Sequence, residues 1–123
     1  MARQEHRVAS LDDLPEKVPF VVRVGDQEIG LVRANGKVHA FANHCAHQGG
    51  PVCYGEVLGK VEAVLDEQKR VRYERFSETE LHLVCPWHGW EYDLETGVNA
   101  ADPSWQIQKF ETIVRGTDVY VVL

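Results

Sequence analysis

The chain is short of positive charge. Its 123 residues hold 13 lysines and arginines against 19 aspartates and glutamates, which gives a formal net charge of −6. Nucleic-acid binding depends on a basic surface that neutralises phosphates, so we exclude that class of function. An acidic surface of this size suits either solubility or docking to a basic patch on a protein partner, and the sequence favours neither.

Long apolar runs are missing as well. Residues 1–17 are polar and charged, without the apolar stretch of a signal peptide, and no segment approaches the length of a membrane span. Arg3 and Arg7 stand apart, so the sequence gives no support for twin-arginine export. We therefore expect a cytoplasmic protein that makes no contact with a membrane.

Cysteine is scarce, with three residues in the chain. A 2Fe–2S ferredoxin of plant type needs four cysteines, and covalent haem attachment needs C-x-x-C-H, which is absent. The chain instead has two short clusters, Cys45-Ala-His47 and Cys85-Pro-Trp-His88, and each combines one cysteine with one histidine. Together they offer two thiolates and two imidazoles as metal ligands.

This set of ligands is compatible with more than one site. Structural zinc sites more often combine C-x2-C with a later H-x3–5-H, and a C-x-H spacing is tight for a zinc knuckle. Two thiolates on one iron and two imidazoles on the other are the ligands of a Rieske 2Fe–2S centre. The sequence favours the Rieske centre, while a zinc site and the absence of any metal remain the alternatives.

The residues around these ligands carry a family resemblance. The segments Cys45-Ala-His47-Gln-Gly49-Gly50-Pro51 and Cys85-Pro86-Trp87-His88-Gly89-Trp90 resemble the paired cluster-binding loops of the Rieske family, C-x-H-x-G-G-P and C-P-x-H-G. The resemblance implies one 2Fe–2S cluster of Rieske type, and its implied ligands are Cys45, His47, Cys85 and His88. It also implies an all-β Rieske fold, in which antiparallel sheets form a base that carries an inserted cluster-binding part.

Further residues of these loops are expected to support the cluster, namely Gly49, Gly50, Pro51, Pro86, Trp87, Gly89, Trp90 and Tyr92. The glycines and prolines shape the loops and expose backbone donors, and the tryptophans shield the cluster from water. Respiratory Rieske proteins have a serine and a tyrosine that donate to the sulfurs. Here Trp90 replaces the serine and Tyr92 keeps the tyrosine, which predicts a midpoint potential in the low to middle part of about −150 to +300 mV.

The chain also lacks the extra disulfide of the respiratory proteins, because Gly50 and Trp87 occupy the two cysteine positions. Cys53 therefore has no partner cysteine, which agrees with a reducing cytoplasm. We expect Cys53 to be a small buried apolar residue, with a role as a spare ligand as the alternative. Trp105 is expected to pack beneath the loops.

Strands are expected throughout the chain. Apolar and β-branched runs between turn residues predict strands over 20–24, 28–33, 38–41, 81–84, 91–94, 108–114 and 119–123. Ser10 and the two aspartates after it predict one helical turn in a polar segment that precedes the first strand. The resemblance implies a single domain over 1–123, with a base of about 1–40 and 96–123 and a cluster-binding part of about 41–95.

A charged insertion, about residues 55–80, lengthens the spacing between the two loops. Alternation at Val71, Tyr73 and, less regularly, Phe76 favours a projecting hairpin with one apolar face, and a short helix over 61–70 is the alternative. Such a hairpin either contacts a second copy or a partner, or covers its own sheet.

The length of the chain limits its function, because 123 residues leave no room for a second catalytic domain like that of Rieske oxygenases. The resemblance implies one-electron transfer as the ferredoxin component of a multicomponent, aromatic-ring dioxygenase system. Its partners would be a flavin reductase and a terminal oxygenase or reductase. The alternatives are a small subunit of a larger reductase, such as assimilatory nitrite reductase, and a redox or iron–sulfur sensor. In each case we expect an electron-transfer component without a catalytic residue of its own.

Overall fold

The computed structural model describes residues 3–44, 53, 55–86 and 89–123, and they form an almost entirely β structure. The elements in chain order are β1 (Glu5–Ser10), η1 (Leu11–Asp13), β2 (Phe20–Val24), β3 (Gln27–Ala34), β4 (Lys37–Ala42), β5 (Glu56–Leu65), β6 (Val71–Val84), β7 (Glu91–Asp93), β8 (Lys109–Arg115) and β9 (Asp118–Val122). None of the described helical residues forms a helix long and apolar enough to span a membrane.

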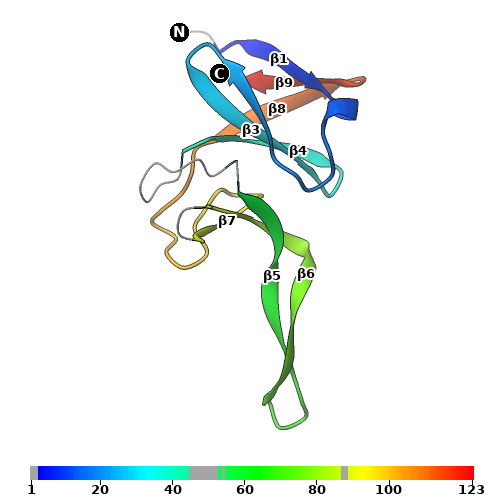
Figure 1. Ribbon diagram of the computed structural model, residues 1–123, viewed down its shortest axis with the longest axis vertical. Coiled ribbons are helices and arrows are strands. Elements are labelled where there is room, and N and C mark those ends of the chain that lie inside the picture. The colour runs from blue at the N-terminus through cyan, green and yellow to red at the C-terminus, as the bar shows by residue number, and fades with distance from the viewer. Residues whose placement is uncertain (1–2, 45–52, 54, 87–88) are drawn as a thin grey trace.

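Six strands form the larger sheet, in the order β1-β9-β8-β4-β3-β2, and every neighbouring pair is antiparallel (Figure 1). Tight turns allow this arrangement. Asn35 and Gly36, between β3 and β4, both have positive φ, 52° and 75°, as a type I′ turn requires. The predicted strands from 20 to 41 and from 108 to 123 are confirmed within one residue at each end.

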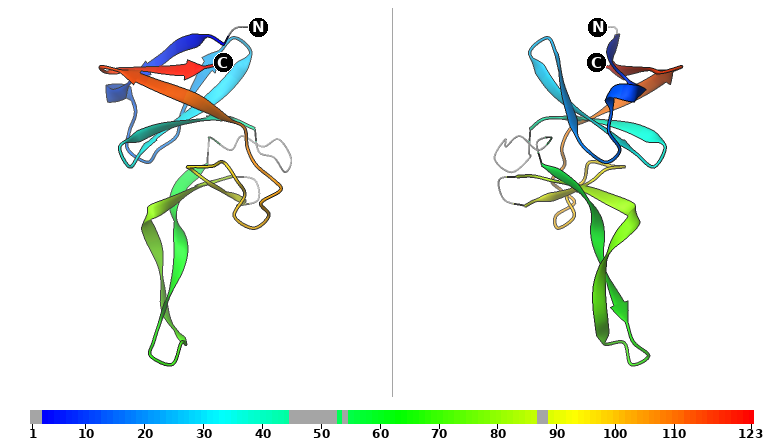
Figure 2. Two further views of the ribbon diagram at one scale, coloured as in Figure 1. Left: turned by 180° about the vertical axis from the view of Figure 1, so that it is seen from behind. Right: turned by 45° about the vertical axis from the view of Figure 1, so that its right-hand side comes forward.

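Three strands form the smaller sheet, in the order β5-β6-β7. In the described structure β7 pairs with β6 only from His82 to Val84, while β5 follows β6 along almost its whole length. Beyond β7 the two long strands continue as a two-stranded ribbon that projects away from both sheets (Figure 1 and Figure 2). We call residues 60–76 of this ribbon the arm. The hairpin predicted for the insertion is confirmed, and the alternative of a helix over 61–70 is wrong.

Local contacts define both ends of the arm. At its base, a Cβ atom on Gly59 would collide with the backbone of Ser77, so the close crossing of the two strands requires glycine. At its tip, Asp66 Oδ1 accepts hydrogen bonds from the backbone N–H groups of Gln68 and Arg70, both at 2.9 Å. Lys69 turns the chain with a φ of 63°.

A shared apolar core joins the two sheets. Val32 and Phe41 of the larger sheet lie in one buried cluster with Leu83 and Tyr92 of the smaller sheet, and Cys53 belongs to the same cluster. A second cluster fills the other part of the larger sheet, between β1, β3, β4 and β9. The core therefore fixes the end of β6 and the start of β7 against the larger sheet.

The N-terminal region differs from its prediction. The helical turn is confirmed, because Ser10 caps η1 and forms a capping box with Asp13. The prediction that only a polar segment precedes the first strand is wrong, since β1 pairs with β9 at the edge of the larger sheet. Its outward side chains are charged, and ion pairs hold them, Arg7 to Asp118 at 2.9 Å and Glu5 to Arg115 at 2.7 Å. Such a polar edge strand lacks the apolar alternation that reveals strands in a sequence.

Candidate metal centre

Of the four predicted cluster ligands, Cys85 lies in the described part of the structure. It follows the last residue of β6, and its side chain is buried in the core beside Leu83 and Tyr92. The other predicted ligands and several supporting residues lie outside the described residues, namely Cys45, His47, His88, Gly49, Gly50, Pro51 and Trp87. The supporting residues that are described all follow Cys85, namely Pro86, Gly89, Trp90 and Tyr92.

The second loop closes as a tight turn between β6 and β7. The backbone N–H of Cys85 donates to the carbonyl of Trp90 at 2.8 Å, and the N–H of Gly89 donates to the carbonyl of Cys85 at 3.0 Å. Gly89 has a φ of 70°, a conformation that side chains with a Cβ rarely adopt. The glycine of the C-P-x-H-G pattern is therefore required by the turn that presents the loop.

A side-chain hydrogen bond links the two ends of the first loop. Asn43 lies just after β4, and its Oδ1 accepts the backbone N–H of Cys53 at 2.8 Å. The backbone N–H of Asn43 donates to the carbonyl of Glu28 at 3.0 Å, which fixes Asn43 to β3. Sequence reasoning missed this residue, and its one local signal is a polar amide directly after a buried strand.

Cys53 lies in the core and has the chemistry of a neutral thiol. Cys53 is 1% exposed, and burial raises the pKa of its thiol from the ordinary value of 9.0 to about 12. Gly30 makes room for it, because a Cβ atom there would collide with the sulfur of Cys53. Its burial in the apolar cluster confirms the prediction of a small buried residue, and the alternative role as a spare ligand stays a prediction.

Two tryptophans pack against each other beside the second loop. The rings of Trp90 and Trp105 have centroids 4.6 Å apart and are tilted by 40°. Buried Asn99 positions the loop that carries Trp105, because its Oδ1 accepts the N–H groups of Ala101 at 2.9 Å and Asp102 at 2.8 Å. The prediction that Trp105 packs beneath the loops is confirmed on the side of Trp90.

A buried polar network ties the larger sheet to the segment after β7. The Lys109 Nζ atom donates to the carbonyls of Leu94 and Glu95 at 3.0 and 2.6 Å, and it lies 3.1 Å from His39 Nδ1. Lysine has no acceptor, so Nδ1 accepts and the His39 ring is neutral. Burial lowers the pKa of His39, and the positive charge of Lys109 lowers it further; burial also lowers the pKa of Lys109.

Comparison with known proteins agrees with these observations. The family model for the Rieske [2Fe-2S] domain matches residues 4–111. The glycine betaine monooxygenase oxygenase subunit of Pseudomonas aeruginosa is 33% identical over 85 residues, which are 68% of this chain. The match spans about 15% of the length of that oxygenase subunit.

Two solved structures of similar size share the fold. The ferredoxin of carbazole 1,9a-dioxygenase from Nocardioides aromaticivorans is 26% identical, with a TM-score of 0.66 and 95% of each chain covered. A Mycobacterium tuberculosis structure, described as an NADH-dependent nitrite reductase small subunit, has a TM-score of 0.76 at 16% identity and covers 100% of this chain and 97% of its own. With the family model, these matches show that the chain belongs to the Rieske [2Fe-2S] family, with one Rieske-type 2Fe–2S cluster as its cofactor.

Proposed function

We propose that this protein is a one-electron carrier, the ferredoxin component of a multicomponent oxygenase system of the aromatic-ring dioxygenase type. The bound cluster supplies a centre that takes up and releases single electrons. The observation that carries the proposal is the match to the carbazole dioxygenase ferredoxin, which covers 95% of both chains at 26% identity. The match to an oxygenase subunit, in contrast, covers about 15% of that subunit.

Cys45, His47, Cys85 and His88 are the ligands in this proposal. Both loops leave the fold from fixed points, which supports the assignment. The first loop begins and ends where Asn43 binds the backbone of Cys53, and the second begins at buried Cys85 and closes on Trp90. Ligands on such anchored loops lose little conformational freedom when they bind a cluster.

The remaining residues control the surroundings of the cluster. Buried Tyr92 and the packed pair of Trp90 and Trp105 exclude water from the side of Cys85. Exclusion of water and hydrogen bonds near the ligands tune the potential of such a centre. The upstream partner in this proposal is a flavin reductase, and the downstream partner is a terminal oxygenase or reductase.

The similarity to the M. tuberculosis structure supports the fold of a second candidate, a small Rieske subunit of a larger reductase such as assimilatory nitrite reductase. The arm favours this candidate, because a freely diffusing carrier does not need a projecting ribbon. A sensor of redox state or of iron–sulfur clusters is a third candidate, and it predicts a redox-dependent interaction without steady electron delivery.

Purification from native cells distinguishes the first two candidates. A carrier is expected to elute alone and to accept electrons from NADH through a flavin reductase at catalytic rates. A permanent subunit is expected to travel at constant ratio with a much larger partner through successive columns. Constant co-elution would overturn the carrier proposal.

We further propose that the arm lets two copies of the chain associate. A two-stranded ribbon is marginal in water by itself, and Leu65, Val71 and Tyr73 on this ribbon are 51, 61 and 50% exposed. If two β6 strands pair antiparallel about Tyr73, Arg72 lies across from Glu74 of the second copy. In that pairing, charged side chains on the arm of one copy therefore face opposite charges on the arm of the other copy.

The compartment and the domain arrangement belong to the same proposal. A buried thiol at Cys53 suits the reducing cytoplasm, which we propose as the location. Residues 1–123 are proposed to form one domain, with a base of about 1–40 and 96–123. The larger sheet is built from strands that end by Ala42 or begin after Gln108, and the smaller sheet lies between them in the chain, within about 41–95.

A further inference from the structure

Four polar side chains gather on one face of the smaller sheet. Glu80 and His82 are two residues apart in β6, and Asp93 of β7 lies directly across from His82. Glu91 lies two residues before Asp93 and contacts His82. Residues two apart, and residues directly opposite, share a face of an antiparallel sheet. The other face carries Leu83 and Tyr92, which are buried in the core.

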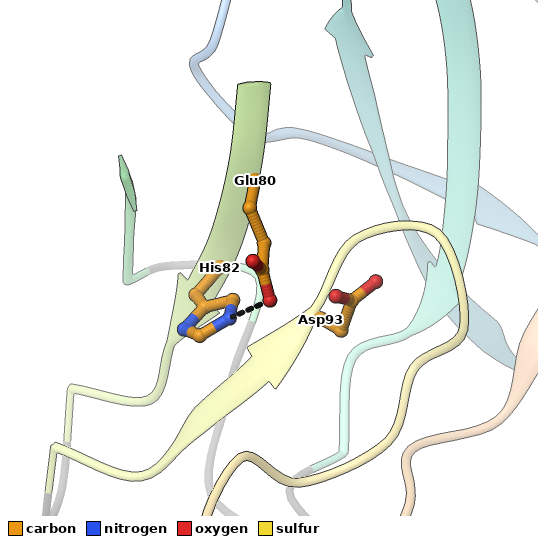
Figure 3. Close-up of side chains that lie close together, drawn as sticks. All are labelled: Glu80, His82 and Asp93. Carbon is orange, nitrogen blue, oxygen red and sulfur yellow. Dashed lines mark ion pairs between the residues drawn. The ribbon is translucent and has the colours of Figure 1, made fainter. Parts of the chain in front are cut away.

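We propose that Glu80, His82 and Asp93 bind a divalent transition-metal ion such as zinc, at a site separate from the cluster ligands. One ligand atom from each of the three side chains lies within 4.8 Å of the others. Figure 3 shows the Glu80 carboxylate beside the His82 ring, with Asp93 approaching from the neighbouring strand. Two atoms that share a zinc ion at about 2.0–2.2 Å are at most about 4.4 Å apart, so the three ligand atoms are already close to the separations that a zinc ion requires.

The state of the buried imidazole is the second observation that points to a cation. The His82 side chain is 5% exposed, and its Nδ1 lies 3.2 Å from Glu91 Oε1. A carboxylate can only accept, so Nδ1 carries a proton, and Nε2 is the ring nitrogen that faces Glu80. The nearest Glu80 oxygen is 3.8 Å from Nε2, which is too long for a hydrogen bond but within the range of an ion pair.

This pairing of a histidine with a carboxylate is the usual second shell of a metal site. Histidines that bind metals donate their other ring N–H to a carboxylate or carbonyl, which fixes the ring and its tautomer. Glu91 has that position relative to His82. Nε2 of His82 faces the Glu80 carboxylate beside Asp93, so a metal ion on Nε2 would lie among carboxylate oxygens, and Glu91 is the positioning residue for the ring.

Backbone hydrogen bonds fix the position of the Asp93 side chain. Its Oδ1 accepts the N–H groups of Glu95 at 2.7 Å and Thr96 at 3.2 Å, which fixes the carboxylate and leaves its other oxygen for an ion. A cavity of about 250 Å³ lined by Glu80, Asp93 and Glu95 opens beside the cluster of side chains and has room for water ligands. One imidazole with two carboxylates and open positions suits zinc or a similar ion.

The test uses the anaerobic holoprotein, stripped of loosely bound metal with a chelator and titrated with zinc alone. Zinc is measured by equilibrium dialysis, and iron and visible absorbance are recorded in the same samples. We expect one zinc per chain at constant iron. Glu80→Gln and Asp93→Asn should each weaken binding at least about tenfold, and Glu91→Gln should weaken it by about tenfold. Asp93→Asn keeps the acceptor for Glu95 and Thr96, and Glu80 is half exposed, so both variants should fold.

Glu95→Gln is the matched control. It removes one negative charge from the wall of the same cavity without changing a proposed ligand, so zinc affinity should stay within about twofold of the parent protein. Equal zinc affinity in the parent, Glu80→Gln and Asp93→Asn proteins would overturn the proposal, as would the absence of binding near one equivalent. Zinc uptake accompanied by loss of iron would place the zinc on the cluster ligands and would also overturn it.

Discussion

Asn43 shows how a residue outside the predicted ligand set can connect the two ends of a loop. Its side-chain oxygen accepts a hydrogen bond from the backbone N–H of Cys53, which lies 10 residues later in the sequence. In the described structure this N–H has no backbone acceptor. One side-chain amide therefore holds the two ends of the first loop together.

Replacing Asn43 should weaken both the fold and the retention of the cluster. Asn43→Ala leaves the N–H of Cys53 without its acceptor, at an expected cost of about 1–3 kcal/mol in the free energy of unfolding. Iron content per chain after gel filtration and urea denaturation provide the measurement. Asn43→Asp keeps the acceptor and should lose less; an Asn43→Ala protein with full iron and parental stability would refute the role of the amide.

His39 should make the protein less stable in acid. Its pKa in the folded state lies below the ordinary value of 6.5, so the unfolded chain binds a proton that the native protein excludes. Stability contributed by neutral His39 is therefore complete above about pH 6.5 and is lost as the pH falls toward the folded-state pKa.

The comparison is between the melting temperatures of the parent and His39→Gln proteins from about pH 8 to pH 5. The advantage of the parent should shrink as the pH falls. Lys109→Gln removes the neighbouring positive charge, so it should reduce this pH dependence without abolishing it. Parallel pH profiles for all three proteins would contradict the assignment.

At the scale of elements, strands with a clear local signal could be predicted from the sequence. Asn35-Gly36 predicts its hairpin because both residues tolerate positive φ, and the register follows from the turn. β1 could not be predicted, because its pairing with β9 and its ion pairs join residues more than 100 positions apart. Lys109 escapes prediction for the same reason, since its partners lie on other segments.

The arm provides the test at this scale. If two copies pair about Tyr73, Glu74→Arg places arginine across from Arg72 of the second copy and should weaken association at least several-fold. The double exchange, Arg72→Glu with Glu74→Arg, restores opposite charges and should restore association. Sedimentation equilibrium gives the dissociation constants.

Two results would end the proposal of self-association. One is a parent protein that stays monomeric at the highest concentration it tolerates. The other is a double exchange that associates no better than Glu74→Arg, because general charge effects would then explain the weakening.

At the scale of the whole molecule, the ligand motif and the architecture support each other. The motif predicts two loops, and the structure places the second between β6 and β7 and fixes both ends of the first against β3 and β4. The sequence predicts the ligand types because each metal requires characteristic donors at short spacing, and this part stays a prediction. The anchoring of the loops could not be predicted, because it depends on how the two sheets pack.

The central claim is that this fold carries a cluster with mixed thiolate and imidazole ligation, tuned without the serine donor of the respiratory proteins. A redox titration of the purified protein, followed by EPR, tests it most directly. We predict a one-electron midpoint potential between about −150 and +200 mV. A potential near about −400 mV would indicate ligation by thiolates alone, and one above about +200 mV would contradict the tuning.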